Sequence, residues 1–423
     1  MPLKLQPKKR VVITGLGVLS SVGVGRENFW AALREGRSGI SKIRRFDASS
    51  FPCQAAGEIS DADFLPLLHT RGIKEKDTRK LSRFTQFCIA ASLLAIEDAK
   101  FEITEANAEE IGVAIGTSAG GFSLGEEQYP LLVQRGPKGI HTYAVSSIIS
   151  SDGPSQVSKH LGIKGIATMF STACASGTDA IGYAADLIKA GKVTAMLAGS
   201  AEAPLTPFFL AAFCRVNALS CSNGDPSKAM RPFDRERDGT ILSEGGGVVL
   251  VEELEHARQR GAHIYAEVLG HGSTSDAYHV LQLAPDGKQA ARAIWLALED
   301  AGVTPDEIDY IHAHGSSTPL NDRVETRVIK EVFGPRAYQL HISSIKSMIG
   351  HMQGGCAGPE VIAGALTIDQ GVIPPTINYE HPDPECDLNY TPNKAIRQDI
   401  RTVLVNSFGF GGKNAALVLR RYS

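Results

Sequence analysis

Cys174 has the sequence surroundings of a nucleophile. It lies in FSTACASGTDAIG, where small residues surround the thiol and a helix is expected to begin directly after it. The free N–H groups and the positive end of the dipole at a helix N-terminus lower a thiol pKa from roughly 8.5 toward roughly 3.5–7.5. The same N–H groups stabilise an oxyanion. The segment therefore predicts a reactive thiol, with a buried structural cysteine as the alternative.

Two histidines lie where an α/β protein collects its functional groups. His314 is in YIHAHGSSTPLND and His351 is in SSIKSMIGHMQGG, five residues after Lys346. Each follows a predicted strand and precedes a turn of small residues. Loops at strand ends carry much of the binding and catalysis in such folds. We therefore expect both histidines beside the thiol, in a site for nucleophilic catalysis.

A metal site is the alternative use of the same residues. His312 and His314 would share one face of a strand, and together with His351 and Cys174 they form a set of zinc-type ligands. No second cysteine accompanies Cys174, and no carboxylate lies at ligand spacing from either histidine. We therefore predict a site without a metal.

The elements that position these residues alternate between strands and helices. Apolar residues at helical spacing predict helices over 79–100, 176–190 and 287–302. Strands are expected at 11–14, 111–115, 195–198, 247–251, 310–312, 341–344 and 403–405. This alternation predicts an α/β protein with buried, largely parallel sheets.

The glycines of VVITGLGVLSSVG resemble the opening of a dinucleotide-binding turn. Gly15, Gly17 and Gly23 miss the G-x-G-x-x-G spacing, and no acidic residue clearly follows at the expected distance. We interpret the segment as a tight structural turn.

Composition excludes several classes of function. The 423 residues are 43% hydrophobic and 21% charged, which suits a large core, and the formal net charge of −3 argues against a nucleic-acid partner. The first 19 residues lack the cleavage pattern of a secretory signal. The most apolar window, 193–213, contains an acid and two prolines, which argues against a membrane span. Seven cysteines without C-x-x-C pairs indicate a reduced, cytoplasmic protein.

The motifs together carry a resemblance to a known family. TACASG, HAHGSSTPLND, KSMIGH and NSFGFGG occur in this order, with MRPFDRERDG, SDAYH and PPTINYEHPDPECDLNY between or after them. The chain resembles the elongating β-ketoacyl-acyl-carrier-protein synthases, in particular the synthase II type, over nearly its whole length. The resemblance implies a thiolase fold: two similar halves, 1–255 and 256–423, in a five-layer α-β-α-β-α arrangement. It also implies a homodimer.

The resemblance also assigns roles to residues. Cys174 would hold an acyl chain as a thioester, and His314 and His351 would stabilise the enolate left when a malonyl thioester loses carbon dioxide. Lys346 would tune the site and orient His351, and Glu360 would be a structural acid. Substrates would arrive on the phosphopantetheine of acyl carrier protein, so no other cofactor is expected. The remaining roles are the oxyanion and gate residues Phe408, Gly409 and Phe410, the phosphopantetheine contacts Ser316 and Thr318, and the carrier-docking residues Lys76, Arg79 and Lys80.

Departures from the family pattern concern the substrate. Ala119 and Ala144 stand where bulkier residues usually line the acyl pocket, to which Phe213 also belongs, and Lys413 replaces the usual Thr beside the gate. Pocket volume discriminates chain length at roughly 1–3 kcal/mol per methylene. Fatty-acid elongation is the first interpretation. A ketosynthase of a specialised type II polyketide or polyene pathway, paired with a second subunit, is the alternative.

Other members of the superfamily fit less well. A silent partner subunit would lack Cys174, a starter-forming decarboxylase typically has Gln there, and a thiolase has a different histidine pattern. A cysteine hydrolase would waste the acyl-enzyme on water. Chain length, pathway and the identity of the second subunit are left open by the sequence.

Overall fold

The computed structural model describes residues 9–423. Its main sheet contains strands from both ends of the chain. These are β1 (Val11–Ser20), β2 (Gly23–Val24), β5 (Ile111–Gly116), β6 (Ala167–Phe170), β7 (Ala195–Glu202), β8 (Gly245–Glu253), β9 (Ala266–Ser275), β10 (Tyr310–His312), β11 (His341–Ser343), β14 (Thr402–Gly409) and β15 (Lys413–Arg420). Two small sheets pair β3 (Ile40–Lys42) with β4 (Ala55–Gly57) and β12 (Val372–Ile373) with β13 (Ile396–Arg397).

The helices fill the connections between these strands. They are α1 (Arg26–Glu35), α2 (Asp61–Thr70), α3 (Glu75–Thr78), α4 (Arg83–Ala99), α5 (Phe122–Arg135), α6 (Ala144–Ile148), α7 (Asp152–Leu161), α8 (Ser176–Lys189), α9 (Pro207–Arg215), α10 (Leu254–Gln259), α11 (Lys288–Ala301), α12 (Pro319–Phe333), α13 (Lys346–Ile349) and α14 (Ala357–Gln370).

The sheet has the same strand topology twice. In the first half the order is β1-β8-β7-β5-β6, and in the second it is β9-β15-β14-β10-β11. In each half the first two pairings are antiparallel and the last two are parallel. A short antiparallel contact between β1 and β9 joins the halves. The expected two similar halves are confirmed, whereas the expectation of largely parallel sheets is wrong, because β8 and β15 run against their neighbours.

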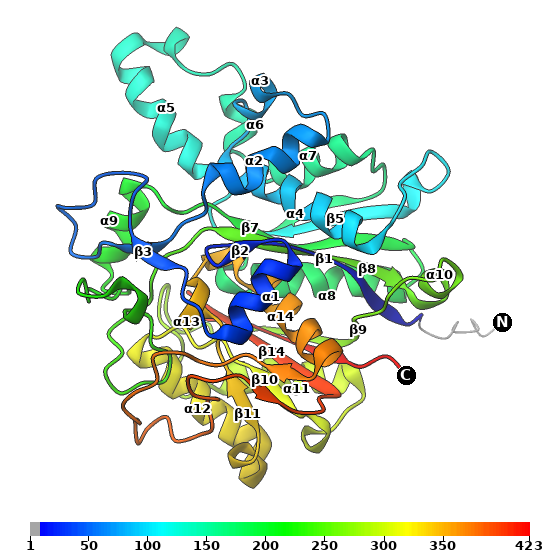
Figure 1. Ribbon diagram of the computed structural model, residues 1–423, viewed down its shortest axis with the longest axis vertical. Coiled ribbons are helices and arrows are strands. Elements are labelled where there is room, and N and C mark those ends of the chain that lie inside the picture. The colour runs from blue at the N-terminus through cyan, green and yellow to red at the C-terminus, as the bar shows by residue number, and fades with distance from the viewer. Residues whose placement is uncertain (1–8) are drawn as a thin grey trace.

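Alternating side chains of the strands build three cores and thereby five layers. Val113 and Ile115 of β5 pack with α4, whereas Ala114 between them packs with α8. In the second half Val403 and Val405 of β14 face the shared central core, and the residue between them joins the core of α11 and α12. This period of two is what strands buried on both faces require. Figure 1 shows the resulting stack, with α8 and α14 between the two halves of the sheet.

Small residues let the central helices approach the sheet closely. A Cβ on Gly358 of α14 would lie 2.0 Å from the Gly247 carbonyl oxygen of β8, and one on Gly177 of α8 would lie 2.5 Å from Ser200 Oγ of β7. Only glycine permits these contacts. A glycine at each crossing therefore brings the backbones of α8 and α14 close to the sheet.

The N-terminal glycines have a different structural role from the one we predicted. Gly15 and Gly17 lie inside β1, so the interpretation as a tight turn is wrong. A Cβ at either position would lie within 2.2 Å of a backbone oxygen of α4. They are therefore sites of close strand–helix packing, and the chain turns only afterwards, between β1 and β2.

The other predicted elements are present with shifted ends. All seven expected strands are found. The helix expected over 79–100 begins at Arg83, because the Ser82 side chain caps it by accepting the Thr85 N–H, and it ends at Ala99. The division at 255/256 stays a prediction and falls inside α10, the helix that links the two halves. Within residues 9–423, no helix is both long and apolar enough to cross a membrane. Of the first 19 residues, which were examined for a secretory signal, residues 1–8 lie outside the described residues.

Candidate active site

A sharp turn between a strand and a helix presents Cys174. Strand β6 ends at Phe170, and the chain enters the short 3₁₀ turn Ala173–Ala175 that leads into α8. Ala173 has φ 52°, a left-handed conformation that costs energy for a residue with a side chain. The strained turn directs the buried thiol toward the second half of the molecule.

The two histidines meet this thiol from the other half. His351 Nε2 lies 3.3 Å from Cys174 Sγ. The ring centroids of His314 and His351 are 5.4 Å apart, and one ligand atom from each of the three residues lies within 4.8 Å of the others. All three line a cavity of about 330 Å³ together with the predicted residues Phe213, Ser316, Thr318, Phe408, Gly409 and Phe410. The structure thus assembles the trio that the sequence placed at separate strand ends.

Lys346 positions His314. Its Nζ donates to the His314 carbonyl oxygen at 2.7 Å, lies 3.4 Å from Nδ1 of that ring, and forms a buried ion pair with Glu360. The expectation that Lys346 orients His351 is therefore wrong, because the lysine reaches the other histidine loop. Donation to Nδ1 favours the tautomer with the proton on Nε2. Burial first, and then Lys346, lower the pKa of His314 well below its usual value, so the ring is neutral.

Cys356 orients His351, a role that sequence reasoning missed. Its Sγ lies 3.0 Å from His351 Nδ1 and accepts the Met352 N–H at 3.0 Å. Burial raises the pKa of Cys356 well above its usual value, so the group is a thiol with a proton to donate. Donation from this thiol to Nδ1 favours the tautomer of His351 with its proton on Nε2. Burial, followed by Lys346, keeps the pKa of that ring low.

The resting thiol is protonated, contrary to the expectation of a lowered pKa. Burial raises the pKa of Cys174 to about 11, although the charge of Lys346 and the Phe410 N–H act in the opposite direction. Desolvation of a thiolate outweighs these favourable interactions. The helix start that the sequence revealed is present, but the depth of the thiol is a property of the tertiary fold.

Alkylation of Cys174 by iodoacetamide is expected to accelerate about tenfold per pH unit from about pH 7 to 10. The thiolate fraction of a group whose pKa lies far above the solution pH grows by that factor. Peptide mapping by mass spectrometry measures the rate at this cysteine, and the exposed Cys221 is the comparison within the same sample. A rate that levels off below about pH 8 contradicts the raised pKa.

A hairpin places the predicted gate over the thiol. Strands β14 and β15 are joined by Phe410–Gly412, and Gly411 and Gly412 have φ of 72° and 66°. The Phe410 N–H points at the Cys174 sulfur. The Phe410 ring stacks on Phe213 with a centroid distance of 5.7 Å. One short turn therefore supplies both a backbone N–H directed at the sulfur and a wall of the cavity.

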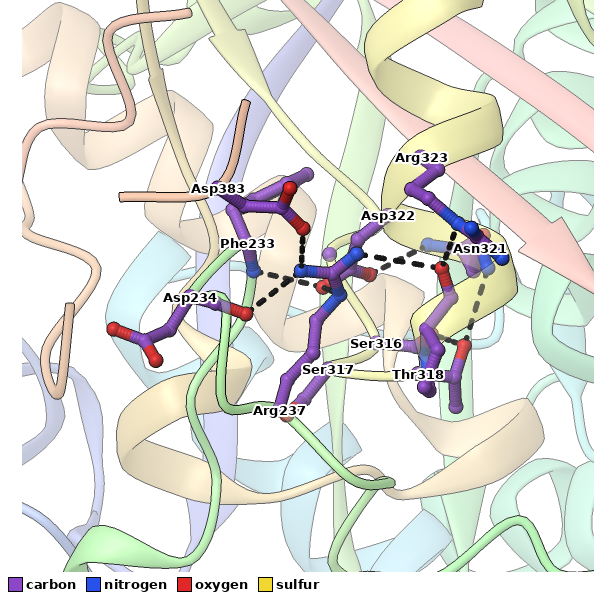
Figure 2. A network of polar contacts seen from close by, with 12 residues as sticks. Phe233, Asp234, Arg237, Ser316, Ser317, Thr318, Asn321, Asp322, Arg323 and Asp383 are labelled. Carbon is purple, nitrogen blue, oxygen red and sulfur yellow. Dashed lines mark hydrogen bonds and ion pairs between the residues drawn. The ribbon is translucent and has the colours of Figure 1, made fainter. Parts of the chain in front are cut away.

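The loop after His314 is anchored by buried charges. Ser316 Oγ and Thr318 Oγ1 are 2.9 Å apart, and Thr318 caps α12. Beside this loop Arg237 donates to Asp383 at 2.6 Å and lies 3.6 Å from Asp322, whose carboxylate also accepts the Phe233 N–H (Figure 2). The MRPFDRERDG motif thus holds the hydroxyl-bearing loop at the cavity.

Glu325 supports the same loop from α12. Its two oxygens accept the N–H groups of His314 and Gly315, both at 2.8 Å. Burial raises the pKa of Glu325 to about 7, against the effect of these hydrogen bonds. Sequence reasoning missed this residue, since nothing in a helical ETRVIKEVF segment shows that it reaches back eleven residues.

Two groups of predicted residues lie away from the cavity. Ala119 donates its N–H to the buried Glu202, and Ala144 begins α6, and neither lines the cavity. In the expected docking patch Lys76 is exposed, whereas Arg79 pairs with Glu75, and Lys80 with Asp77 at 2.6 Å. The patch is therefore less positive than its basic residues alone suggest. His312, considered as a metal ligand, is buried and is not part of the group formed by Cys174, His314 and His351.

The doubled fold and the cysteine beside two neutral histidines define a thiolase-fold enzyme. The N-terminal domain of β-ketoacyl synthases matches residues 8–257, and the C-terminal domain matches residues 265–380. The chain belongs to the β-ketoacyl synthase family, and it is a condensing acyltransferase.

Relatives from two kinds of pathway are similar to the chain. A 3-oxoacyl-[acyl-carrier-protein] synthase 2 of Synechocystis sp. is 45% identical over 98% of this chain and 99% of that protein. The ketoacyl synthase alpha subunit of the tetracenomycin polyketide synthase of Streptomyces glaucescens is 43% identical, with coverage of 98% and 97%. The solved ishigamide ketosynthase/chain length factor has a TM-score of 0.90 and 37% identity, and the match covers 98% of this chain and all of that chain.

Proposed function

We propose that the chain elongates acyl groups in fatty-acid synthesis, with Cys174 as the nucleophile and His314 and His351 as enolate-stabilising donors. The observation that carries the proposal is the convergence of these three side chains, within 4.8 Å of one another, at the cavity that the Phe410 hairpin borders. The 45% identical synthase supports the choice of pathway and of acyl carrier protein as the substrate carrier.

The first half-reaction transfers the acyl group. The Cys174 sulfur attacks the thioester carbon, the carbon–sulfur bond to the carrier breaks, and the thiol proton ends on the departing pantetheine sulfur. The N–H groups of Cys174 and Phe410 face the transient oxyanion. Ser316 and Thr318 hold the pantetheine at the cavity entrance, and the rings of Phe408 and Phe410 separate the two substrates.

The second half-reaction forms the new carbon–carbon bond. The malonyl thioester loses carbon dioxide, and the electron pair of the broken bond becomes an enolate whose oxygen accepts the Nε2–H groups of His314 and His351. Neutral donors suit this task, because they stabilise developing charge without giving up a proton. The second carbon attacks the Cys174 thioester, the thiolate leaves, and the 3-oxoacyl product remains on the carrier.

A second subunit covers the face formed by α5 and α6 in this proposal. Tyr129, Val133, Val145 and Ile149 there are each more than half exposed, and β6, the terminal strand of the sheet, has an unpaired edge. Large exposed apolar side chains and unpaired strand edges are both typical of an interface. The subunit is a second copy of this chain, or a chain length factor as in the ishigamide complex.

Other parts of the proposal concern specificity and location. Lys76, Arg79 and Lys80 guide the acidic carrier, and no further cofactor takes part. Ala144 is the first residue of α6, and the far end of the acyl pocket, with Ala119 and Ala144, forms only when the subunits meet. The small volume of both residues favours the second candidate, a ketosynthase for bulky or unsaturated polyketide chains. Seven free cysteines suit the reducing cytoplasm.

Reconstitution with malonyl carrier protein and a panel of acyl carrier proteins tests the function. We expect release of carbon dioxide and a 3-oxoacyl product two carbons longer than the donor, detected by intact mass. Preference for saturated chains supports fatty-acid elongation, and preference for unsaturated or oxygenated chains supports the second candidate. A folded protein that forms no product from any donor, alone or with a chain length factor, overturns both.

A further inference from the structure

Gln353 has a buried amide in the active site with an unsatisfied donor. Its side chain is part of the cavity lining, the residue is only 4% exposed, and its Nε2 has no hydrogen-bond partner among residues 9–423. Its Oε1 lies 3.9 Å from Cys174 Sγ. Leaving such a donor unpaired costs about 1–3 kcal/mol, so buried amides without partners are rare outside functional sites.

The backbone around Gln353 is held in one position. The residue has φ 51°, a left-handed conformation that is strained for glutamine. The two glycines that follow are packed against the fold, since a Cβ on Gly354 would lie 2.4 Å from Ser118 N and one on Gly355 would lie 2.9 Å from Glu202 Cβ. The backbone of the segment therefore cannot move to bring the amide to another partner.

In the proposed mechanism the other donors beside Cys174 have their own acceptors. The N–H groups of Cys174 and Phe410 serve the carbonyl of the acyl thioester, and the histidines serve that of the malonyl thioester. Both of those oxygens are on the first carbon of a thioester. An acceptor for Gln353 must therefore come from elsewhere on a substrate, close to the sulfur of Cys174.

We propose that the amide N–H of Gln353 binds an oxygen on the third carbon of a substrate thioester. Two substrates carry one: the carboxylate of a malonyl group and the 3-oxygen of an acyl chain that has not been fully reduced. The inference rests on the proposed function, because it takes Cys174 as the acylated residue. It adds a subsite that recognises an oxygenated third carbon.

The variant Gln353→Met tests the subsite, since it keeps the length of the side chain and removes the donor. One arm measures decarboxylation of malonyl carrier protein in the absence of an acyl donor. The other measures acylation of Cys174 from 3-oxohexanoyl and from hexanoyl carrier protein, with intact mass as the readout. Gln282→Met is the matched control, because Gln282 lies exposed at the rim of the same cavity.

In Gln353→Met we expect either the decarboxylation rate or the rate of 3-oxohexanoyl transfer to fall about tenfold, the effect of losing one buried hydrogen bond. The rate of hexanoyl transfer should stay within about twofold of the wild type. Loss of decarboxylation identifies the malonyl carboxylate as the acceptor of the Gln353 N–H. Loss of 3-oxohexanoyl transfer identifies the 3-oxygen of the acyl chain as that acceptor. The proposal is overturned if neither falls relative to hexanoyl transfer, or if Gln282→Met gives the same pattern. Gln353→Asn, with an amide one methylene shorter, repeats the test if Gln353→Met is unstable. Failure of hexanoyl transfer in the wild type would instead refute the function of Cys174.

Discussion

Cys174→Ala is expected to abolish acyl transfer while leaving decarboxylation of the malonyl thioester measurable. No other side chain in the cavity is placed to form the thioester, so the acyl mass should disappear and condensation should fall by at least about 10³-fold. Decarboxylation depends on the Nε2–H groups of His314 and His351, which this change leaves in position. Intact mass after mixing with an acyl carrier protein and release of labelled carbon dioxide measure the two steps separately.

The histidine variants complete the experiment. His314→Ala and His351→Ala should each keep the acyl adduct on Cys174 and lower decarboxylation by about 10²–10³-fold, the usual effect of removing one oxyanion donor. Equal loss of both steps in all three variants would mean that the residues act as a single unit. An acyl adduct on Cys174→Ala would assign the nucleophile elsewhere and refute the mechanism.

The sequence revealed the reacting groups because each is a residue type common in catalysis and lies at the end of a predicted strand. Cys174 before a helix and the two histidines in small-residue loops could be found without knowing how the loops meet. The strands that were missed explain the limit of this reasoning. The pattern AEVLGHGSTS of β9 mixes charges and glycines and has no clear apolar run, yet the strand is central in the sheet because the residues of its neighbours bury it.

What the sequence did not reveal depends on contacts between distant segments. Lys346 pairs with the His314 loop, Glu325 reaches back to it from α12, and Cys356 orients His351. The prediction of a lowered pKa for Cys174 was wrong for the same reason, because the depth at which the thiol is buried depends on how the layers assemble. Local patterns predict elements and residue types, whereas pairing, tautomers and desolvation follow from tertiary packing.

Lys346→Met is expected to lower the free energy of unfolding by about 3–5 kcal/mol. Lys346 and Glu360 are both fully buried and pair with each other, so removal of the lysine leaves a carboxylate without a counterion in the interior. His314 also loses the donor that holds its carbonyl and Nδ1. Urea unfolding measures the stability, and decarboxylation measures the effect on the site.

The pH dependence identifies the cause of this loss. Burial already raises the pKa of Glu360 against the influence of Lys346, and without the lysine the pKa rises further. The folded variant then holds a proton that the unfolded chain releases, so its stability must increase as the pH is lowered through the raised pKa of Glu360. Lys346→Met combined with Glu360→Leu should regain most of the lost stability, because no charge is left buried, but not the activity. If the double variant is no more stable than the single one, the loss comes from packing rather than from the stranded carboxylate.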